Sequence, residues 1–244
     1  MKTAIVTVAT GDYLEGARVL FKSLERHGLP SGIDRLIIGP DSCAFAEPVK
    51  MDDDYSWVSA PNLKNRDSLK NFYPLTMAYD RVISLNADML CIGDPSYLWS
   101  ERIGTLPLYA ALDTAAQTYY PENLLRLELD PLLIFNAGLY VYNRNRLPDL
   151  HETMMREIAE GQVQTYEIGD QGFWNNFFQR HSLEVGLLPS GLNYCLDRYM
   201  PQLPPAHQRI IHFTGHKPWR WTAPPSDWVY PYYQAWQAEH DRGD

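Results

Sequence analysis

The sequence of 244 residues has few cysteines, no excess of basic residues and no long apolar run. Its three cysteines, Cys43, Cys91 and Cys195, lie far apart and form no Cys-x-x-Cys pair. This spacing argues against a disulfide framework or a zinc knuckle and is typical of reduced thiols in a cytoplasmic protein. The formal net charge is −9, and no basic run compensates it locally. We therefore expect no nucleic-acid partner, because binding to phosphates depends on clustered Lys and Arg.

Membrane-spanning and repeat patterns are also missing. No apolar run approaches the roughly 18 residues of a membrane-spanning helix, so we expect no membrane span. The N-terminal segment MKTAIVTVATGD meets Gly-Asp where a signal peptide has small residues, and we interpret it as a first core strand. No linker, low-complexity segment or internal repeat is found. With 45% hydrophobic and 21% charged residues, the composition favours a single α/β domain over residues 1–244.

Apolar runs separated by helical patterns predict a Rossmann-like, mostly parallel α/β sheet flanked by helices. Strands are expected at 3–10, 34–39, 81–85, 107–112, 132–142, 183–189 and 208–213. Helices are expected at 13–28, from about Pro74, at 148–160 and from Asp170 onward. The first strand, helix and second strand form a β-α-β unit whose crossover is long enough for parallel pairing. A dinucleotide dehydrogenase is excluded, because Thr-Gly-Asp-Tyr replaces the Gly-x-Gly-x-x-Gly turn after the first strand.

Polar residues follow several of these apolar runs. The segment RVISLNADMLCIGD, residues 81–94, ends its first run in Asn86-Ala87-Asp88. A carboxylate at the end of a buried strand is costly unless a cation meets it. The carboxyl ends of strands are also where ligands bind in open α/β sheets. The other polar clusters are Thr10 to Tyr13, Asn136 to Gly138, Asp170 to Gly172 and His212 to Trp219.

In their order and spacing, these clusters resemble the family 8 retaining glycosyltransferases, the family of glycogenin, galactinol synthase and bacterial lipopolysaccharide galactosyltransferases. The resemblance covers most of the chain, from Ala4 to Trp219, and rests on five segments. They are IVTVATGDYLEGARVLFKSL, YDRVISLNADML, FNAGLYVYN, GDQGFWNNFF and IHFTGHKPW. The resemblance implies a GT-A type fold and the transfer of a hexose, glucose or galactose, from a UDP-sugar to a carbohydrate or other hydroxylated acceptor.

The resemblance also implies a divalent metal, Mn²⁺ or Mg²⁺, at the diphosphate of the donor. Negative charge accumulates on the leaving diphosphate, and a metal held by oxygen ligands and an imidazole neutralises it. Asp88 and His212 are the implied ligands. Asn86 stands where the family has the first Asp of an Asp-x-Asp motif, so it offers an uncharged oxygen and should weaken the metal site. Lys217 would add positive charge at the phosphates, and Gly215 would let the backbone approach them.

Further matches imply residues for the base, the sugar and the reaction. The implied donor-binding residues are Val8, Thr10, Gly11 and Tyr13 at the uracil and ribose, Lys70 and Ala87 along the donor, and Asn136, Ala137 and Glu167 at the sugar. Asp170 and Gln171 are the implied catalytic residues. Retention allows a double displacement with Asp170 as nucleophile, or a front-face attack in which the leaving phosphate takes the acceptor proton. We favour the front-face path.

The sequence leaves structural interpretations of these residues open. Asp88 could be a strand-end carboxylate bound by backbone N–H groups, and His212 a core histidine bound to a carbonyl. Asp12 and Asp170 also suit the N-caps of helices. Lys70 could equally be a solvated helix residue.

Two other functions also remain open at this point. One is a sugar-nucleotide-binding protein that has lost efficient transfer through Asn86. The other is a metal-independent transferase in which Lys70 and Lys217 compensate the diphosphate charge. Glycogenin glucosylates a tyrosine of its own chain, but the matching position here is Asp197, so self-glucosylation is not predicted. The resemblance is compatible with a homodimer.

Overall fold

The computed structural model describes residues 1–39, 43–51, 66–113, 116, 121–161, 170–196, 203–221 and 228–242, without the side chains of 66–68 and 123. Its helices and strands, with short 3₁₀ helices labelled η, are β1 (Thr3–Val8), α1 (Tyr13–Arg26), β2 (Asp34–Ile38), β3 (Glu47–Val49), η1 (Arg66–Thr76), β4 (Arg81–Leu85), β5 (Met89–Cys91), η2 (Ser96–Trp99), β6 (Leu108–Leu112), α3 (Pro121–Arg126), η3 (Pro131–Leu133), β7 (Phe135–Asn143), η4 (Arg144–Arg146), α4 (Leu150–Ala159), α5 (Asp170–Arg180), β8 (Val185–Leu187), η6 (Ser190–Leu192), β9 (Tyr194–Cys195), η7 (Pro205–His207), β10 (Ile210–His212), η8 (Pro218–Arg220) and α6 (Tyr230–His240).

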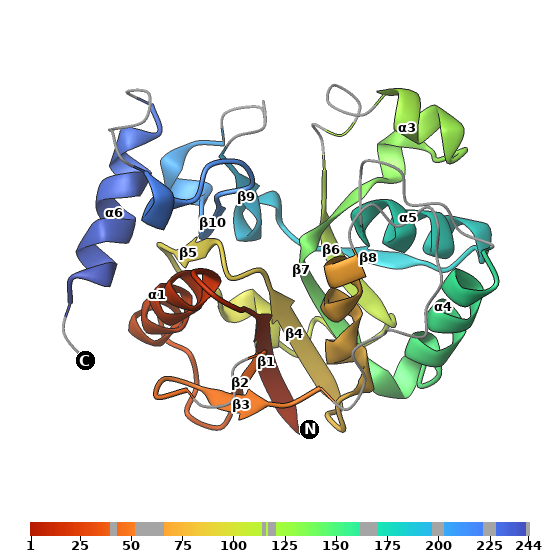
Figure 1. Ribbon diagram of the computed structural model, residues 1–244, viewed down its shortest axis with the longest axis horizontal. Coiled ribbons are helices and arrows are strands. Elements are labelled where there is room, and N and C mark those ends of the chain that lie inside the picture. The colour runs from red at the N-terminus through yellow and green to blue at the C-terminus, as the bar shows by residue number, and fades with distance from the viewer. Residues whose placement is uncertain are drawn as a thin grey trace.

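A seven-stranded sheet lies at the centre of the molecule (Figure 1). Its strand order is β3-β2-β1-β4-β7-β6-β8. β7 runs antiparallel to both of its neighbours, whereas the other neighbouring strands pair in parallel. The predicted mostly parallel α/β sheet is therefore confirmed. β1 lies inside the sheet because its β-branched and apolar residues are suited to burial on both faces.

A small sheet with the order β5-β10-β9 continues directly from the large one. Residues 86–88 are all that separates β4 from β5, so they form the link between the two sheets. β10 pairs antiparallel with β5 and places His212 opposite Met89. The N–H of Phe213 donates to the carbonyl of Asp88 over 2.9 Å, which extends this pairing by one step. The register thus brings His212 beside the link, although the two segments lie far apart in the sequence.

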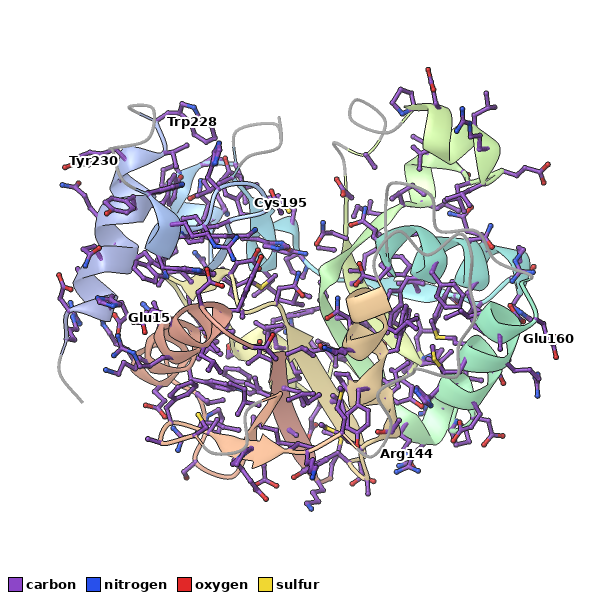
Figure 2. The ribbon with its side chains drawn as sticks, in the orientation of Figure 1. Glu15, Arg144, Glu160, Cys195, Trp228 and Tyr230 are labelled. Atoms are coloured by element: carbon purple, nitrogen blue, oxygen red, sulfur yellow. The ribbon has the colours of Figure 1, made fainter. Side chains whose placement is uncertain are left out.

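The small sheet packs against helices α1 and α6. Val19 of α1, Leu90 of β5, Ile211 of β10 and Trp236 of α6 belong to one apolar cluster. Figure 1 shows α6 beside α1, at the end of the molecule opposite α4. Figure 2 labels Cys195, the last residue of β9, on the side of the small sheet that faces the large one. The cluster therefore holds the small sheet in place relative to the first helix.

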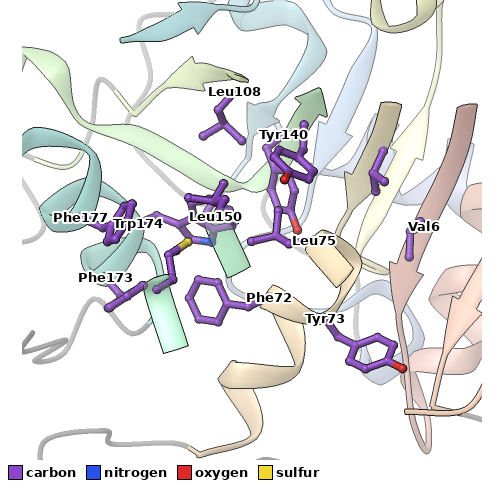
Figure 3. Close-up of a cluster of buried hydrophobic side chains, with 14 of the residues drawn as sticks. Val6, Phe72, Tyr73, Leu75, Leu108, Tyr140, Leu150, Phe173, Trp174 and Phe177 are labelled. Atoms are coloured by element: carbon purple, nitrogen blue, oxygen red, sulfur yellow. The ribbon is translucent and has the colours of Figure 1, made fainter. Parts of the chain in front are cut away.

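Two apolar layers cover the two faces of the large sheet. Val6 of β1 points into one layer, with η1, α4 and α5, whereas Ile5 points into the other, with α1. Figure 3 shows the first layer, in which Phe72 of η1, Tyr140 of β7 and Trp174 of α5 meet. The ring centroid of Trp174 lies 5.2 Å from that of Phe72 and 4.9 Å from that of Tyr140. These contacts fix η1 and α5 against the middle of the sheet.

The structure corrects the predicted helix start near Pro74. The segment is the 3₁₀ helix η1, and Pro74 lies near its end. In a 3₁₀ helix the N–H of residue 74 would donate to the carbonyl of Asn71, but proline has no N–H. The hydroxyl of Tyr140 donates to that carbonyl instead, over 3.0 Å. A bond from the neighbouring strand therefore replaces the one that proline cannot make.

Other differences concern element ends and short elements. The first strand ends at Val8, two residues earlier than predicted, because the chain turns at Gly11 with φ of +59° to enter α1. β5, β9 and α6 were not predicted. Strands of two or three residues show no period, and α6 carries its aromatic residues on more than one face. In the described part of the chain, none of the helices combines the length and apolarity needed to cross a membrane.

Gly16 of α1 packs against the link between the sheets. A Cβ at this position would lie 2.5 Å from the carbonyl oxygen of Ala87 and 2.5 Å from a ring carbon of Trp219. Although Ala is normally the better helix residue, we expect Gly16→Ala to lower the free energy of unfolding by about 1–3 kcal/mol through overpacking. Urea denaturation measures this change. Gly32→Ala is the control, since no described atom lies within 4 Å of its Cβ position, and an equal loss in both variants would contradict the packing role of Gly16.

Candidate active site

Asp88 lies in the link between the sheets and is only 6% exposed. Its Oδ2 accepts a hydrogen bond from Nζ of Lys217 over 2.5 Å, and its Oδ1 lies 3.4 Å from Nε2 of His212. Burial raises the pKa of Asp88, but its interactions with His212 and Lys217 outweigh burial and lower this pKa to about 2. The structural alternative of a carboxylate bound by backbone N–H groups is therefore wrong, because side chains are the groups that hold it.

The segment after β10 brings Lys217 back to this carboxylate. Nζ of Lys217 also donates to the carbonyl of Phe213 over 2.6 Å, so the segment closes into a compact turn. An ammonium group with two such acceptors is held in place rather than free in solvent. The predicted cationic residue thus meets the predicted metal ligand Asp88 directly.

The imidazole of His212 is buried between the two sheets and is 3% exposed. It lies against Gly138 of β7, where a Cβ atom would overlap the ring. Its Nδ1 lies 2.9 Å from Oδ1 of Asn193, which precedes β9. The alternative of a core histidine bound to a carbonyl therefore holds only in part. The partner of Nδ1 is the carbonyl of a side-chain amide, not of the backbone, and Nε2 faces Asp88.

Four side chains, which we call the buried amide network, continue from this point into the large sheet. Nδ2 of Asn193 donates to Oδ1 of Asn136 over 2.9 Å. Nδ2 of Asn136 donates to Oε1 of Gln171 over 3.1 Å and, more weakly, to Oδ2 of Asp113 over 3.4 Å. Nε2 of Gln171 donates to the same Asp113 oxygen over 2.9 Å. The four residues are at most 6% exposed and join the ends of β6, β7 and α5 to the small sheet.

Asp170, the first residue of α5, adjoins this network through Gln171. Its carboxylate accepts a hydrogen bond from Nδ2 of Asn71 over 2.7 Å. Burial raises the pKa of Asp170, and the hydrogen bonds from Asn71 and from backbone N–H groups offset this only in part. The two carboxyls therefore differ, because Asp88 has the ammonium of Lys217 to stabilise its charge whereas Asp170 has an amide.

The polar cluster after β1 is held by the segment that follows Lys217. Both guanidinium nitrogens Nε and Nη2 of Arg220 donate to Asp12, over 2.5 and 2.9 Å, and Nε1 of Trp219 donates to it over 3.2 Å. The rings of Tyr13 and Trp219 meet edge to face at 5.3 Å. Asp12 occupies the N-cap position of α1 but makes no capping hydrogen bond, so that prediction is wrong. Arg220 takes the carboxylate instead, because a bidentate charged pair is stronger than one bond to an amide.

The remaining predicted donor residues lie around these groups or outside the described chain. Of these, Ala87 and Ala137 are buried, Val8, Tyr13, Lys70 and Asn86 are half-buried, and Thr10, Gly11 and Gly215 are exposed. Glu167 lies outside the described residues, as does Asp197. The structure thus brings Asp88, His212, Lys217, Asn136 and Gln171 together. The assignment of the base-binding residues stays a prediction.

Asp88 and His212 fit a divalent cation through the chemistry of their donor atoms. A carboxylate oxygen and an imidazole nitrogen are common ligands of Mn²⁺ and related ions, and here the two atoms face each other. The set is incomplete, because in the described ranges no three His, Cys, Asp or Glu residues gather to hold a metal. Further ligands would come from the neutral Asn86 and from the phosphates of the donor.

Three residues of this region were missed by the sequence analysis. Asp113 directly follows β6, as Asp88 follows the end of β4, so the position of a carboxylate at a strand end was a usable signal. Asn193 and Asn71 lie in segments without a clear period. Their partners come from distant parts of the chain, so nothing in the local sequence indicated their roles.

Three solved structures show a similar fold. The galactosyltransferase LgtC, in complex with donor and acceptor sugar analogs, gives a TM-score of 0.73 at 16% identity over 97% of this chain and 95% of its own. GlyE from Streptococcus pneumoniae TIGR4 gives 0.65 at 17% identity over 100% of this chain and 61% of its own. Mouse xyloside xylosyltransferase 1 gives 0.62 at 15% identity, over 87% of this chain and 97% of its own. At such identity the likeness shows the fold, which is the predicted GT-A type.

Sequence comparison supplies the family. No curated protein sequence is significantly similar to this one. The model of glycosyl transferase family 8 matches residues 67–223, a segment that holds Asp88, the buried amide network and Lys217. Since this match covers more than half of the 244 residues, the chain belongs to glycosyl transferase family 8 and is a glycosyltransferase.

Proposed function

We propose that the chain transfers a hexose, glucose or galactose, from a UDP-sugar to a carbohydrate or other hydroxylated acceptor, with retention of configuration. The observation that carries this proposal is a continuous line of polar side chains that runs from the partly buried Lys217 through the buried Asp88 and His212 to the buried amide network. A sheet with a purely structural role would bury apolar groups there, because every buried amide or charge must find partners. A glycosyltransferase needs such a line, since its donor has a charged and a hydroxylated end.

Lys217, Asp88 and His212 form the end that suits the diphosphate. A cation bound by Asp88 and His212 would neutralise the charge that develops on the leaving diphosphate. The ammonium of Lys217 lies in the same cluster and would remain close to the phosphates. Asp88 and His212 are buried and Lys217 is partly buried, which strengthens these interactions, since water screens them less than at the surface.

Asp113, Asn136, Gln171 and Asp170 form the end that suits the sugar. Their carboxylate and amide oxygens accept hydrogen bonds from hydroxyls, and their amide nitrogens donate to hydroxyl oxygens. In the front-face path, the acceptor oxygen forms a bond to the anomeric carbon while the bond between that carbon and the phosphate oxygen breaks. The released phosphate oxygen takes the proton of the acceptor hydroxyl. We favour this path because burial raises the pKa of Asp170 and so disfavours the ionised form that a nucleophile requires.

Metal-independent transfer is the second candidate. It is favoured by the 2.5 Å contact of Lys217 with Asp88, which neutralises the carboxylate without a metal. Asn86 adds no charge that would attract a cation. In this case Lys217, together with Lys70 of η1, would compensate the charge of the leaving diphosphate.

The proposed function is tested by UDP release from a panel of UDP-sugars, with Mn²⁺ and with a chelator. We expect slow hydrolysis of the UDP-sugar that requires Mn²⁺. Its rate should fall by about 100-fold or more in Asp88→Ala, because the carboxylate would hold the metal and Lys217 at the diphosphate. Asp94→Ala is the matched control: Asp94 lies after β5 whereas Asp88 lies before it, and it is exposed and accepts a hydrogen bond from the backbone N–H of Ser96.

The other outcomes of this experiment separate the alternatives. UDP release that is indifferent to the chelator would refute the metal role of Asp88 and His212 and support metal-independent transfer. Tight UDP binding without release from any sugar or acceptor would indicate a protein that has lost efficient transfer.

Asn86→Asp restores the charge that the family motif has at this position. We expect Mn²⁺ to bind more tightly to this variant, since a carboxylate is the stronger ligand for a divalent cation. Titration calorimetry of the free protein with Mn²⁺ measures the affinity. An unchanged or weaker affinity would mean that Asn86 does not face the metal.

Asp170→Asn removes a partly buried carboxyl whose pKa is raised. The folded state binds this proton more tightly than the unfolded chain does, so the wild type loses stability as the pH rises above the ordinary value of 3.8. The variant lacks this loss and keeps an oxygen that can accept from Asn71. We therefore expect it to be more stable than the wild type near neutral pH, with slower UDP release.

Urea denaturation at a series of pH values from 3.8 to neutrality measures the effect. The stability difference between Asp170→Asn and the wild type should shrink as the pH falls. Asp12→Asn is the control with the opposite sign, because the hydrogen bond from Arg220 lowers the pKa of Asp12. A difference for Asp170→Asn that does not change with pH would refute the raised pKa.

A further inference from the structure

We infer that Asn193 is a positioning residue that fixes the tautomer of His212, so that Nδ1 carries the proton and the lone pair of Nε2 faces Asp88. The inference rests on the proposed function, because it concerns the site proposed for the metal and the diphosphate. Neither the sequence clusters nor the family match assigns Asn193 a role. The directions of three successive hydrogen bonds, from the backbone to the imidazole, determine this tautomer.

The direction is set first at Gly138. Its backbone N–H can only donate, and it lies 2.9 Å from the side-chain atom of Asn136 that is Oδ1. That atom must therefore be the amide oxygen, since the NH₂ group offers no acceptor. The same orientation lets Nδ2 of Asn136 donate to Gln171 and Asp113, as the geometry requires.

The second step passes through Asn193. One end of its amide lies 2.9 Å from Oδ1 of Asn136, and because an oxygen cannot donate to an oxygen, this end is the NH₂ group. The other end, the oxygen, then lies 2.9 Å from Nδ1 of His212. An amide oxygen only accepts, so Nδ1 carries the hydrogen. The thiol of Cys195, labelled in Figure 2, lies 3.7 Å from Nδ1 and is a much weaker partner than this amide.

The third step concerns the opposite edge of the ring. A neutral imidazole has one N–H, so a proton on Nδ1 leaves a lone pair on Nε2. Nε2 lies 3.4 Å from Oδ1 of Asp88, so a lone pair and an anionic oxygen face each other. Such an arrangement is favourable when a cation lies between them or when the imidazole gains a proton. In metal sites, a histidine ligand commonly donates its second N–H to an outer partner, and here Asn193 is that partner.

The surroundings keep this arrangement rigid. Asn193 is 1% exposed, and the ring of His212 occupies the space that the missing side chain of Gly138 leaves open. Gly138 therefore has two roles, since its N–H orients the amides and its lack of Cβ admits the ring. The opposite orientation of Asn193 would put its amide oxygen against Oδ1 of Asn136, an unfavourable contact between two acceptors.

Nitrogen NMR of His212 in the metal-free protein tests the inference. At a pH where the imidazole is neutral, we expect a pyrrole-type Nδ1 and a pyridine-type Nε2. Asn193→Leu removes the acceptor and should release the tautomer, whereas Asn193→Asp keeps an acceptor for Nδ1–H but loses the donor to Asn136. We expect Mn²⁺ affinity to fall by about 10- to 100-fold in the Leu variant and to stay at least at the wild-type value in the Asp variant.

Each outcome bears on one part of the argument. A proton on Nε2 in the wild type would overturn the inference, as would unchanged Mn²⁺ affinity in Asn193→Leu. Equal losses in the Leu and Asp variants would reduce Asn193 to a structural role toward Asn136. If the wild type has the expected tautomer but binds no Mn²⁺, the metal part of the proposed function fails while the positioning role stands.

A buried asparagine elsewhere supplies the matched control. Asn176 of α5 donates to the carbonyl of Leu127 over 3.1 Å and accepts from Arg180 over 2.9 Å. Asn176→Leu should lower stability, as Asn193→Leu does, without changing the nitrogen shifts of His212. A similar shift change in both variants would show that the NMR signal reports general loosening and would overturn the inference.

Discussion

The buried carboxylate of Asp88 is the constraint on which the rest of the site depends. A buried charge without a partner costs several kcal/mol, so the fold must bring compensating groups to it. The small sheet does this: the pairing of β5 with β10 places His212 at the carboxylate, and the turn after β10 returns Lys217. A shift of that pairing by one residue would turn His212 to the opposite face. Three short strands are thus held in one register by the need to pair one charge.

The buried amide network imposes a second, directional constraint. Apolar groups of similar size can replace one another in a core, but an amide must offer donors and acceptors to the correct neighbours. Each unmet group would cost about 1–3 kcal/mol. Asn136 satisfies Gly138, Asn193 and Gln171 at once, which couples the large sheet, α5 and the small sheet. The aromatic layer around Trp174 holds α5 at the position that this coupling requires.

The large sheet was predictable because each of its main strands carries its own signal. The apolar runs at 81–85 and 132–142 were recognised from local sequence and became β4 and most of β7. Of the small sheet only β10 was predicted, within the run at 208–213. β5 and α6 were not, because they are short or lack a clear period and acquire order from packing on α1. β9 was not either, because its two residues form a strand only by pairing with β10. The same limit applies to the site. Asp88 and His212 were found through motifs. Asn193 gains its partners from the pairing of β9 with β10 and from contact with β7, which no local pattern encodes.

Asn86 changes the charge balance of the site and thereby its need for a bound cation. Asp88 and Lys217 carry opposite charges, so with a neutral His212 the cluster is neutral before any ligand enters. An aspartate at position 86 would leave one uncompensated negative charge beside a buried one, and a cation would then be needed to keep the empty site stable. With Asn86, the empty site needs no cation for its stability. The excess negative charge would enter the site only with the diphosphate of the donor. Cation binding in this chain should therefore depend on the donor more strongly than it would in a site with two carboxylates.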